Sequence, residues 1–142
     1  MPKINESELK KEIKSGDFKN AYLLYGEESY LKEYYASELK NKIVDKTFEA
    51  FNFHYFDGKD TELDDILKDA QMLPMMSEYN FVMVKDYPIE KSANDIKLLE
   101  EYLKDAPDTT VFVFWFDAIE PDVKSAKFKK VIKAFEKAGD CV

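Results

Sequence analysis

The chain has 142 residues, of which 45% are hydrophobic and 15% aromatic, so it suits one domain with its own core and excludes a disordered tail. No apolar run is long enough to span a bilayer, the first residues lack a signal-peptide pattern and the single cysteine, Cys141, cannot form an internal disulfide, so we expect a cytoplasmic protein with no membrane partner. A net charge of −8 disfavours direct DNA binding, and because all 21 basic residues are lysines this chain offers no arginine finger.

Helices and strands are predicted to alternate along the chain. Apolar residues spaced three or four apart indicate helices, whereas short apolar or aromatic runs bounded by turn residues indicate strands. In chain order, these patterns predict a helix over 7–14, a strand over 21–25, a helix over 28–44, a strand over 51–56, a helix over 63–70, a strand over 81–85, a helix over 95–103, a strand over 111–116, a last helix, and the first residues of a fifth strand at 141–142.

Particular residues are expected to set the helix ends. Gly16 is placed to stop the first helix, and the 61–64 segment resembles a capping box for the helix over 63–70. Pro121 is expected to open the last helix and Gly139 to end it.

The strands carry apolar residues on both faces, which indicates parallel strands covered by helices on both sides. We therefore predict an α/β fold with a mostly parallel, doubly wound sheet, whose default functional site lies at the carboxyl ends of the strands. Residues 1–142 are expected to form one domain. Because a buried strand is an unusual place for a natural terminus, we also expect the chain to be a fragment of a longer protein.

The loop after the first strand does not have the composition of a phosphate-binding loop. It contains a single glycine, Gly26, no lysine, and two carboxylates, Glu27 and Glu28, which suit a helix N-terminus and repel a nucleotide. We expect no cofactor and no ATP binding here.

No catalytic residue and no metal site are predicted. Asp86 and Asp117 follow the third and fourth strands, where a nucleotide hydrolase would hold its magnesium, but isolated carboxylates make weak metal sites and we interpret both as loop residues. The single histidine, His54, lies inside an aromatic strand and is interpreted as structural.

The last helix carries a lysine-rich outer face. Solvation is the usual explanation of such a face, and contact with an acidic partner or a neighbouring subunit is the alternative. The six lysines are Lys124, Lys127, Lys129, Lys130, Lys133 and Lys137.

The 71–78 segment, between a helix and the third strand, is unusually apolar for a connection. Five of its first six residues are apolar, and Pro74 lies among three methionines. Exposed apolar clusters of this kind mark interaction sites, and methionine suits a compliant contact because it is flexible and polarizable. The residues alone allow equally that Met72, Leu73 and Met76 turn inward and seal the edge of the sheet.

Taken together, these motifs resemble the N-terminal domain of the delta subunit of the bacterial DNA polymerase III clamp loader. The resemblance covers essentially the whole chain, and it depends on the order and spacing of four motifs. They are the Tyr-Leu-Leu-Tyr-Gly-Glu-Glu signature at 22–28 with Leu31 following, an Asn-x-x-x-Phe-Asp pattern at 52–57, a Leu-Pro-hydrophobic-hydrophobic-Ser step at 73–77, and the strand at 81–85.

The resemblance implies an AAA+/P-loop-NTPase-like fold with a degenerate phosphate loop, and a domain that is not an enzyme within a DNA polymerase III holoenzyme. It implies that the apolar step binds and opens the ring-shaped sliding clamp, the beta subunit, and that DNA is contacted only indirectly. By position, the step is Leu73, Pro74, Met75 and Met76, with Met75 the best candidate for the inserting tip; the family often has aromatic residues at the last two positions. It further implies lid and collar domains, which are absent from this chain, and contacts of that missing C-terminal part with the other clamp-loader subunits.

Two other functions remain open. A phosphoacceptor receiver domain is also doubly wound and would use Glu27, Glu28 and Asp86, although Asp117 and Ala118 follow Phe116 where a small hydroxyl residue is required. An active nucleotide hydrolase is the second alternative.

Overall fold

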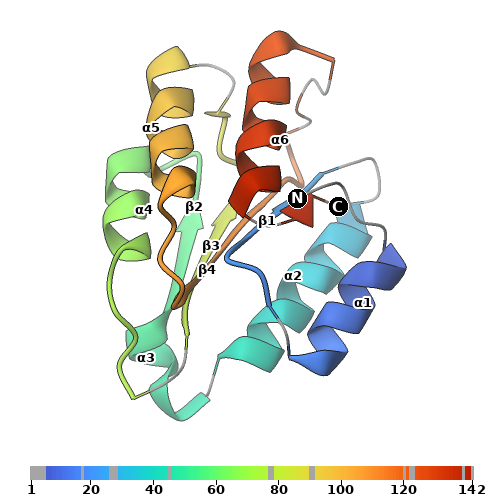
Figure 1. The fold of residues 1–142 in the computed structure, drawn as a ribbon, viewed down its shortest axis with the longest axis vertical. Coiled ribbons are helices and arrows are strands. Elements are labelled where there is room, and N and C mark those ends of the chain that lie inside the picture. The colour runs from blue at the N-terminus through green and yellow to red at the C-terminus, as the bar shows by residue number, and fades with distance from the viewer. Residues whose placement is uncertain are drawn as a thin grey trace.

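The computed structural model describes residues 6–16, 18–25, 29–44, 46–76, 79–89, 92–119, 121, 124–138 and 140–141. Helices and strands alternate along the chain, as predicted, and Figure 1 shows their arrangement. The elements are α1 (Glu6–Ser15), β1 (Ala21–Leu24), α2 (Ser29–Ile43), the 3-10 helix η1 (Lys46–Phe48), α3 (Glu49–Asn52), β2 (Phe53–Asp57), α4 (Leu63–Ala70), β3 (Asn80–Lys85), α5 (Ala93–Lys104), β4 (Thr110–Trp115), α6 (Ala126–Ala138) and β5 (Asp140–Cys141).

The strands form one sheet in the order β2-β3-β4-β1-β5, and every neighbouring pair is parallel. Because β1 lies between β4 and β5, the connections leave the centre of the sheet in both directions. The predicted parallel, doubly wound sheet is therefore confirmed.

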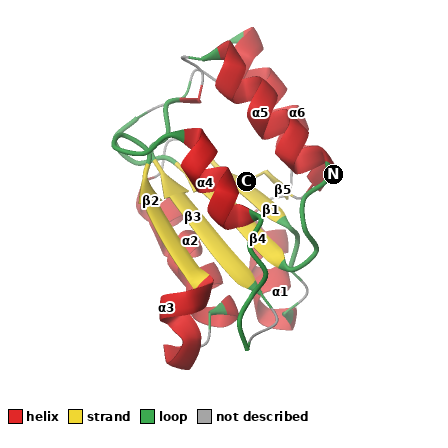
Figure 2. Cartoon of the chain, turned by 90° about the vertical axis from the view of Figure 1, so that its left-hand side faces the viewer, coloured by secondary structure: helices red, strands yellow, loops and turns green. Residues whose placement is uncertain are grey.

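Helices cover both faces of the sheet, with α1 and α2 on one side and α4, α5 and α6 on the other (Figure 2). Alternate residues of each strand point to opposite faces. Thus Phe112 and Phe114 pack among residues of α4, α5 and α6, whereas Val111 and Val113 pack among residues of α1 and α2. This two-sided burial is the reason the strands lack any polar alternation.

Of the expected helix ends, the one at Gly16 is confirmed. Gly16 has a φ of 79°, which glycine adopts without steric cost, and its N–H donates to the carbonyl of Glu12 at 3.0 Å. Gly139, expected to end the last helix, lies outside the described residues.

Three local predictions are wrong. The strand expected over 51–56 begins at Phe53, because Asn52 still belongs to α3 and its side chain bonds a distant loop. The capping box at 61–64 does not form: Glu62 makes no side-chain cap bond, and the Thr61 hydroxyl donates to the carbonyl of Asp57 at 3.0 Å.

The third concerns the last helix, which begins at Ala126 and not at Pro121. The Ser125 hydroxyl oxygen accepts the N–H of Phe128 at 3.1 Å and so caps the helix. A side-chain acceptor at this position decides the start, and the fixed φ of a proline four residues earlier does not.

Candidate functional site

The carboxyl edge of the sheet carries an acid that is used structurally. Asp86, which follows β3, is 2% exposed and has a φ of 57°. Its carboxylate accepts three backbone N–H groups, those of Asp117 at 2.6 Å, Ala118 at 3.2 Å and Ile119 at 3.2 Å. Burial raises the pKa of Asp86, but these hydrogen bonds lower it more, so the pKa lies below its ordinary value. Asp86 thus ties the loop after β4 to the end of β3.

The second acid of this edge is also engaged. The Asp117 carboxylate lies 3.5 Å from the ammonium group of Lys85, at the end of β3, in a half-exposed ion pair. Among the described residues, no group of three His, Cys, Asp or Glu side chains is arranged to hold a metal ion. The phosphate-loop positions Gly26, Glu27 and Glu28 lie outside the described residues.

His54 lies in β2 and is half-buried, with its Nδ1 3.5 Å from the Asp69 carboxylate of α4. It thus joins the edge strand to the helix above it, which agrees with its interpretation as structural.

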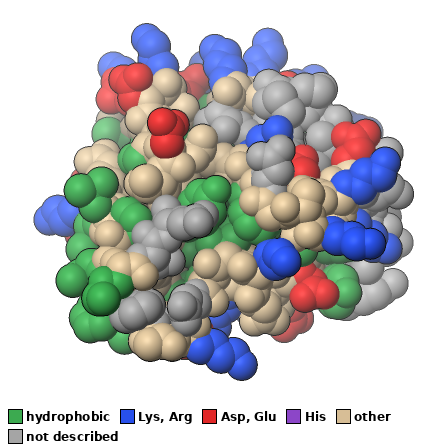
Figure 3. Space-filling view, turned by 60° about the horizontal axis from the view of Figure 1, so that its bottom comes forward, with side chains coloured by type: hydrophobic (Ala, Val, Ile, Leu, Met, Phe, Trp, Pro, Cys, Tyr) green, Lys and Arg blue, Asp and Glu red, His purple; other side chains and the backbone are tan. Residues whose placement is uncertain are grey.

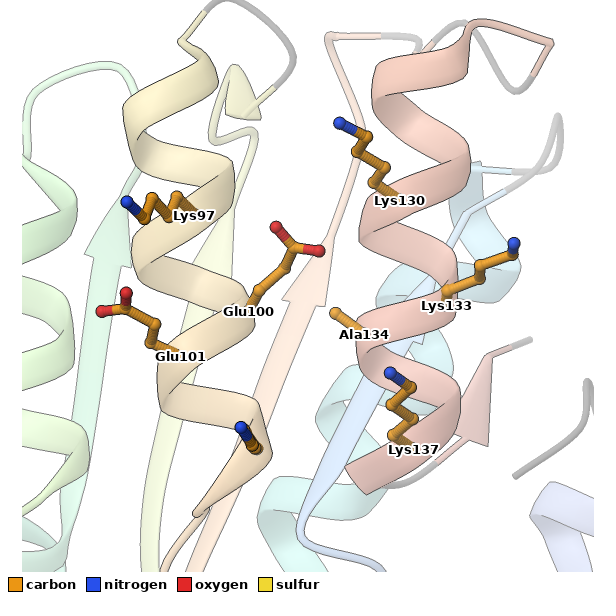
Figure 4. Close-up of a pocket in the computed structure, with 8 residues that line it drawn as sticks. Lys97, Glu100, Glu101, Lys130, Lys133, Ala134 and Lys137 are labelled. Carbon is orange, nitrogen blue, oxygen red and sulfur yellow. The ribbon is translucent and has the colours of Figure 1, made fainter.

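The six lysines are all exposed; five lie on α6, and Lys124 precedes it. Three of them line a groove between α5 and α6, in which Glu100 extends from α5 toward α6 and Lys130 extends from α6 toward α5 (Figure 4). The groove is lined by Lys97, Glu100, Glu101, Lys104, Lys130, Lys133, Ala134 and Lys137. Both charge signs meet there on exposed side chains, which is typical of a solvated face. A subunit contact on this face stays a prediction.

The apolar segment lies at the opposite, amino edge of the sheet, since it runs from the end of α4 to the start of β3 (Figure 1). We call its described part, residues 71–76, the apolar loop. Four of its apolar side chains are exposed: Met72 by 49%, Leu73 by 77%, Met75 by 55% and Met76 by 81%. Pro74 between them is half-buried. The alternative, in which Met72, Leu73 and Met76 seal the sheet edge, is thereby contradicted.

The apolar side chains of the loop do not stand alone on this side of the molecule. Phe51 of α3 is 55% exposed, and the next residue, Asn52, bonds the backbone of Met75 in the loop. Figure 3 looks onto this end of the molecule, where hydrophobic side chains gather on one side. Exposed apolar side chains that gather in this way mark a contact for another molecule.

Two buried asparagines hold the backbone of the apolar loop. The side-chain amide of Asn80, the first residue of β3, donates to the carbonyls of Asp69 at 3.0 Å and Met72 at 3.3 Å. Asn52, the last residue of α3, donates from its Nδ2 to the carbonyl of Met75 at 2.7 Å, and its Oδ1 accepts the N–H of Met75 at 2.6 Å. The loop is therefore fixed at both ends while its side chains face water.

Met76 has a φ of 55°, a left-handed conformation that costs a residue other than glycine about 1–3 kcal/mol. The surrounding structure must offset this cost, and strain of this kind concentrates at functional sites.

Sequence reasoning found the apolar loop but missed the residues that hold it. In the sequence, Asn52 stands out only as the first residue of the Asn-x-x-x-Phe-Asp motif at 52–57, and Asn80 belongs to no motif. The available signal was an asparagine beside each of two strongly apolar strands, where a buried polar side chain needs a partner. The identity of that partner depends on tertiary structure and is not readable from spacing.

Comparisons with known proteins agree on one family. The family model described as DNA polymerase III, delta subunit, matches residues 22–141. The DNA polymerase III subunit delta of Bacillus subtilis (strain 168) is 32% identical over 134 residues, which are 89% of this chain and 38% of that protein. The chain thus spans about two fifths of this relative's length.

Solved structures show the same fold. The Bacillus subtilis DNA clamp loader delta protein (YqeN) matches with a TM-score of 0.78 at 27% identity, over 96% of this chain and 41% of that one. A DNA polymerase III gamma subunit-related protein of Thermotoga maritima matches with a TM-score of 0.64 at 17% identity, over 94% and 44% of the two chains. RuvB of Thermotoga maritima matches with a TM-score of 0.50 at 15% identity, over 94% and 40%. The last two show the fold alone, and it is the AAA+-like fold.

Among the described residues, no helix combines the length and apolar character needed to cross a membrane. The family model over residues 22–141 and the Bacillus subtilis protein that is 32% identical both name the delta subunit of DNA polymerase III. The chain belongs to the delta-subunit family of DNA polymerase III, a family of clamp-loader subunits in DNA replication.

Proposed function

We propose that this domain is a non-catalytic, cytoplasmic part of a clamp loader that binds the ring-shaped sliding clamp, the beta subunit, and opens the ring. Its contact surface comprises Leu73, Pro74, Met75 and Met76. One observation carries the proposal: a loop that is held at both ends presents Leu73 and Met76 with 77% and 81% of their surfaces exposed. Exposed apolar side chains on a fixed backbone suit insertion into a pocket of another protein.

The side chains of the apolar loop supply part of the free energy of a specific contact. Burying one apolar side chain stabilises a complex by about 1.5–3 kcal/mol. Three such side chains therefore contribute roughly 5–9 kcal/mol before association costs of about 4 kcal/mol or more are subtracted, so micromolar binding requires further contacts beside them.

Opening the ring requires more than binding it. A ligand with equal affinity for the closed and the open clamp shifts no population, so the apolar loop must contact the open form more favourably. A loop that inserts beside the subunit interface of the ring can do this, because its pocket changes shape when that interface separates.

The acids at the carboxyl edge support a non-catalytic role. The Asp86 carboxylate accepts three backbone N–H groups, which leaves it poorly placed to bind magnesium or to accept a phosphoryl group as a receiver domain requires. In our proposal the other loader subunits contact the part of the protein beyond this chain, and DNA is reached through the complex. Incubation with a small phosphodonor and magnesium, and titration with ATP, test the two alternatives; phosphate on Asp86 or measurable ATP binding would revive them.

Substitutions in the apolar loop test the proposed contact. We expect Leu73→Ala and Met75→Ala each to weaken binding of the domain to purified sliding clamp from the same organism by at least tenfold, because each removes a buried anchor. Surface plasmon resonance measures the affinity and urea unfolding measures the stability. Since both side chains are exposed, stability should change by less than about 0.5 kcal/mol.

Tyr34→Ala is the matched control. Tyr34 is 52% exposed on α2, on the other face of the sheet, so its removal deletes a comparable exposed apolar side chain without touching the loop. We expect its clamp affinity to equal that of the unmodified domain. Unchanged affinity of both loop variants rejects the assigned contact.

A further inference from the structure

We propose that Asn52 is a positioning residue, which presets the backbone of the apolar loop in the conformation that binds. The inference rests on the proposed function, since binding is what a preset loop serves. Asn52 makes no contact with the partner in this account. It acts through Met75.

Asn52 binds the backbone of one loop residue through both ends of its side-chain amide. Its side chain is 2% exposed and bonds Met75 in both directions, with Nδ2 donating to the carbonyl at 2.7 Å and Oδ1 accepting the N–H at 2.6 Å. Paired bonds of opposite direction fix the orientation of a peptide unit as well as its distance. No aspartate can reproduce this pair when ionised, because it offers acceptors only.

Asn52 is itself held by regular structure. It ends α3 and is followed directly by β2, which pairs with β3 along its whole length. Glu49, at the start of α3, forms a 3.2 Å ion pair with Lys40 of α2, which ties the short helix to the helix before it. The two hydrogen bonds of Asn52 therefore fix the apolar loop relative to the edge of the sheet.

Asn80 completes the arrangement at the other end of the loop, where it bonds the Met72 carbonyl at 3.3 Å. Between the two anchored positions only Leu73 and Pro74 remain, and proline has a fixed φ. Met76, which has a left-handed φ, follows directly after Met75. Few backbone conformations satisfy all these restraints, so the exposed side chains are displayed in a narrow set of positions.

Presetting matters for affinity because only the competent conformation binds. The apparent dissociation constant equals the intrinsic constant divided by the competent fraction, so a loop that is competent one time in ten binds ten times more weakly. Without the Asn52 hydrogen bonds, the binding free energy must also offset the entropy cost of ordering Met75 and its neighbours. The loss falls on the association rate, since a smaller fraction of the free domain is in the competent conformation when it meets its partner.

The test compares Asn52→Ala with Asn20→Ala. Asn20 is the matched control because its side-chain amide donates to the carbonyls of Pro107, Asp108 and Thr110, which all lie outside the apolar loop. We expect Asn52→Ala to remain folded, to lose protection of the Met75 amide against hydrogen exchange, and to associate with purified sliding clamp at least tenfold more slowly. Asn20→Ala should keep both properties.

Exchange of the Met75 amide in the free, unsubstituted domain provides a check that depends on no variant. Protection of this amide on an otherwise exposed loop supports the positioning role of Asn52, and exchange at the rate of an unstructured peptide overturns it. Clamp binding by folded Asn52→Ala at the unmodified rate, or equal losses in both variants, also overturns the positioning role. If the unsubstituted domain does not bind the sliding clamp at all, the proposed function fails, while the exchange result still decides whether Asn52 presets the loop.

Discussion

Asp86 shows how a residue that suggests chemistry can be used for architecture. Its position after β3 is where a nucleotide hydrolase needs an acid, but its φ of 57° turns the carboxylate toward the backbone of residues 117–119. Aspartate tolerates this left-handed conformation better than most residues. Hydrogen bonds to an ionised acceptor are stronger than those to a neutral one, so the three N–H groups stabilise the ionised Asp86 carboxylate. These bonds hold the two neighbouring loops together.

The free energy of unfolding should report this role. We expect Asp86→Asn, which keeps the shape and the tolerance of a positive φ, to lower the free energy of unfolding by about 1–3 kcal/mol at neutral pH. Asp117→Asn, which breaks only the half-exposed pair with Lys85, should cost less than about 1 kcal/mol. Urea unfolding measures both. Equal costs would contradict the assigned role of Asp86.

The same substitution has a predicted pH dependence. Because the folded-state pKa of Asp86 lies below its unfolded value of about 3.9, the unfolded state binds more protons on acidification. The stabilisation is therefore fully present above about pH 5 and is lost as the pH falls through the folded-state pKa. The stability difference between the unsubstituted protein and Asp86→Asn should shrink in acid. A constant difference is the contrary result.

At the scale of elements, the long periodic patterns were reliable and the short local signals were not. The spacing of Leu63, Ile66 and Leu67 predicted α4, and the apolar run at 111–116 predicted β4, because burial on a sheet enforces both patterns. The capping box at 61–64 and the helix start at Pro121 failed, because other local hydrogen bonds form instead, from Thr61 to Asp57 and from Phe128 to Ser125. The strand order was not predicted either, since it depends on how the connections cross the sheet.

The candidate site divides in the same way. Composition alone predicted which residues of the loop are apolar, but their exposure depends on whether the backbone is held away from the core. Bonds from Asn52 and Asn80, which lie 23 and 8 residues from their loop partners, decide that question. Long-range hydrogen bonds of this kind leave no periodic trace in one sequence.

The start of α6 gives a prediction at this scale. We expect Ser125→Ala to lower the free energy of unfolding by about 1 kcal/mol, because the N–H of Phe128 loses its acceptor. Pro121→Ala, outside the helix, should cost less than about 0.5 kcal/mol. Chemical denaturation of the two variants decides between the starts, and a larger effect of the proline substitution would restore the original assignment.

Considered as a whole, the molecule separates its two edges. At the carboxyl ends of β3 and β4, where doubly wound folds usually bind ligands, the Asp86 carboxylate is bonded to the backbone and Asp117 is paired with Lys85. The amino edge carries the apolar loop, whose backbone is fixed from α3 and β3 and whose apolar side chains are exposed. In the proposed function, protein contact is made from the end of the sheet opposite to the usual ligand site.

Methionine methyl NMR measures the central claim most directly, because the chain carries both the probes and their control. Met75 and Met76 are exposed in the apolar loop, whereas Met83 is 6% exposed in the core between the sheet and α2. On titration with purified sliding clamp, the methyl signals of Met75 and Met76 should shift or broaden while that of Met83 stays unchanged. Clamp binding that leaves both loop methyls unperturbed, or no binding at all, would contradict the account.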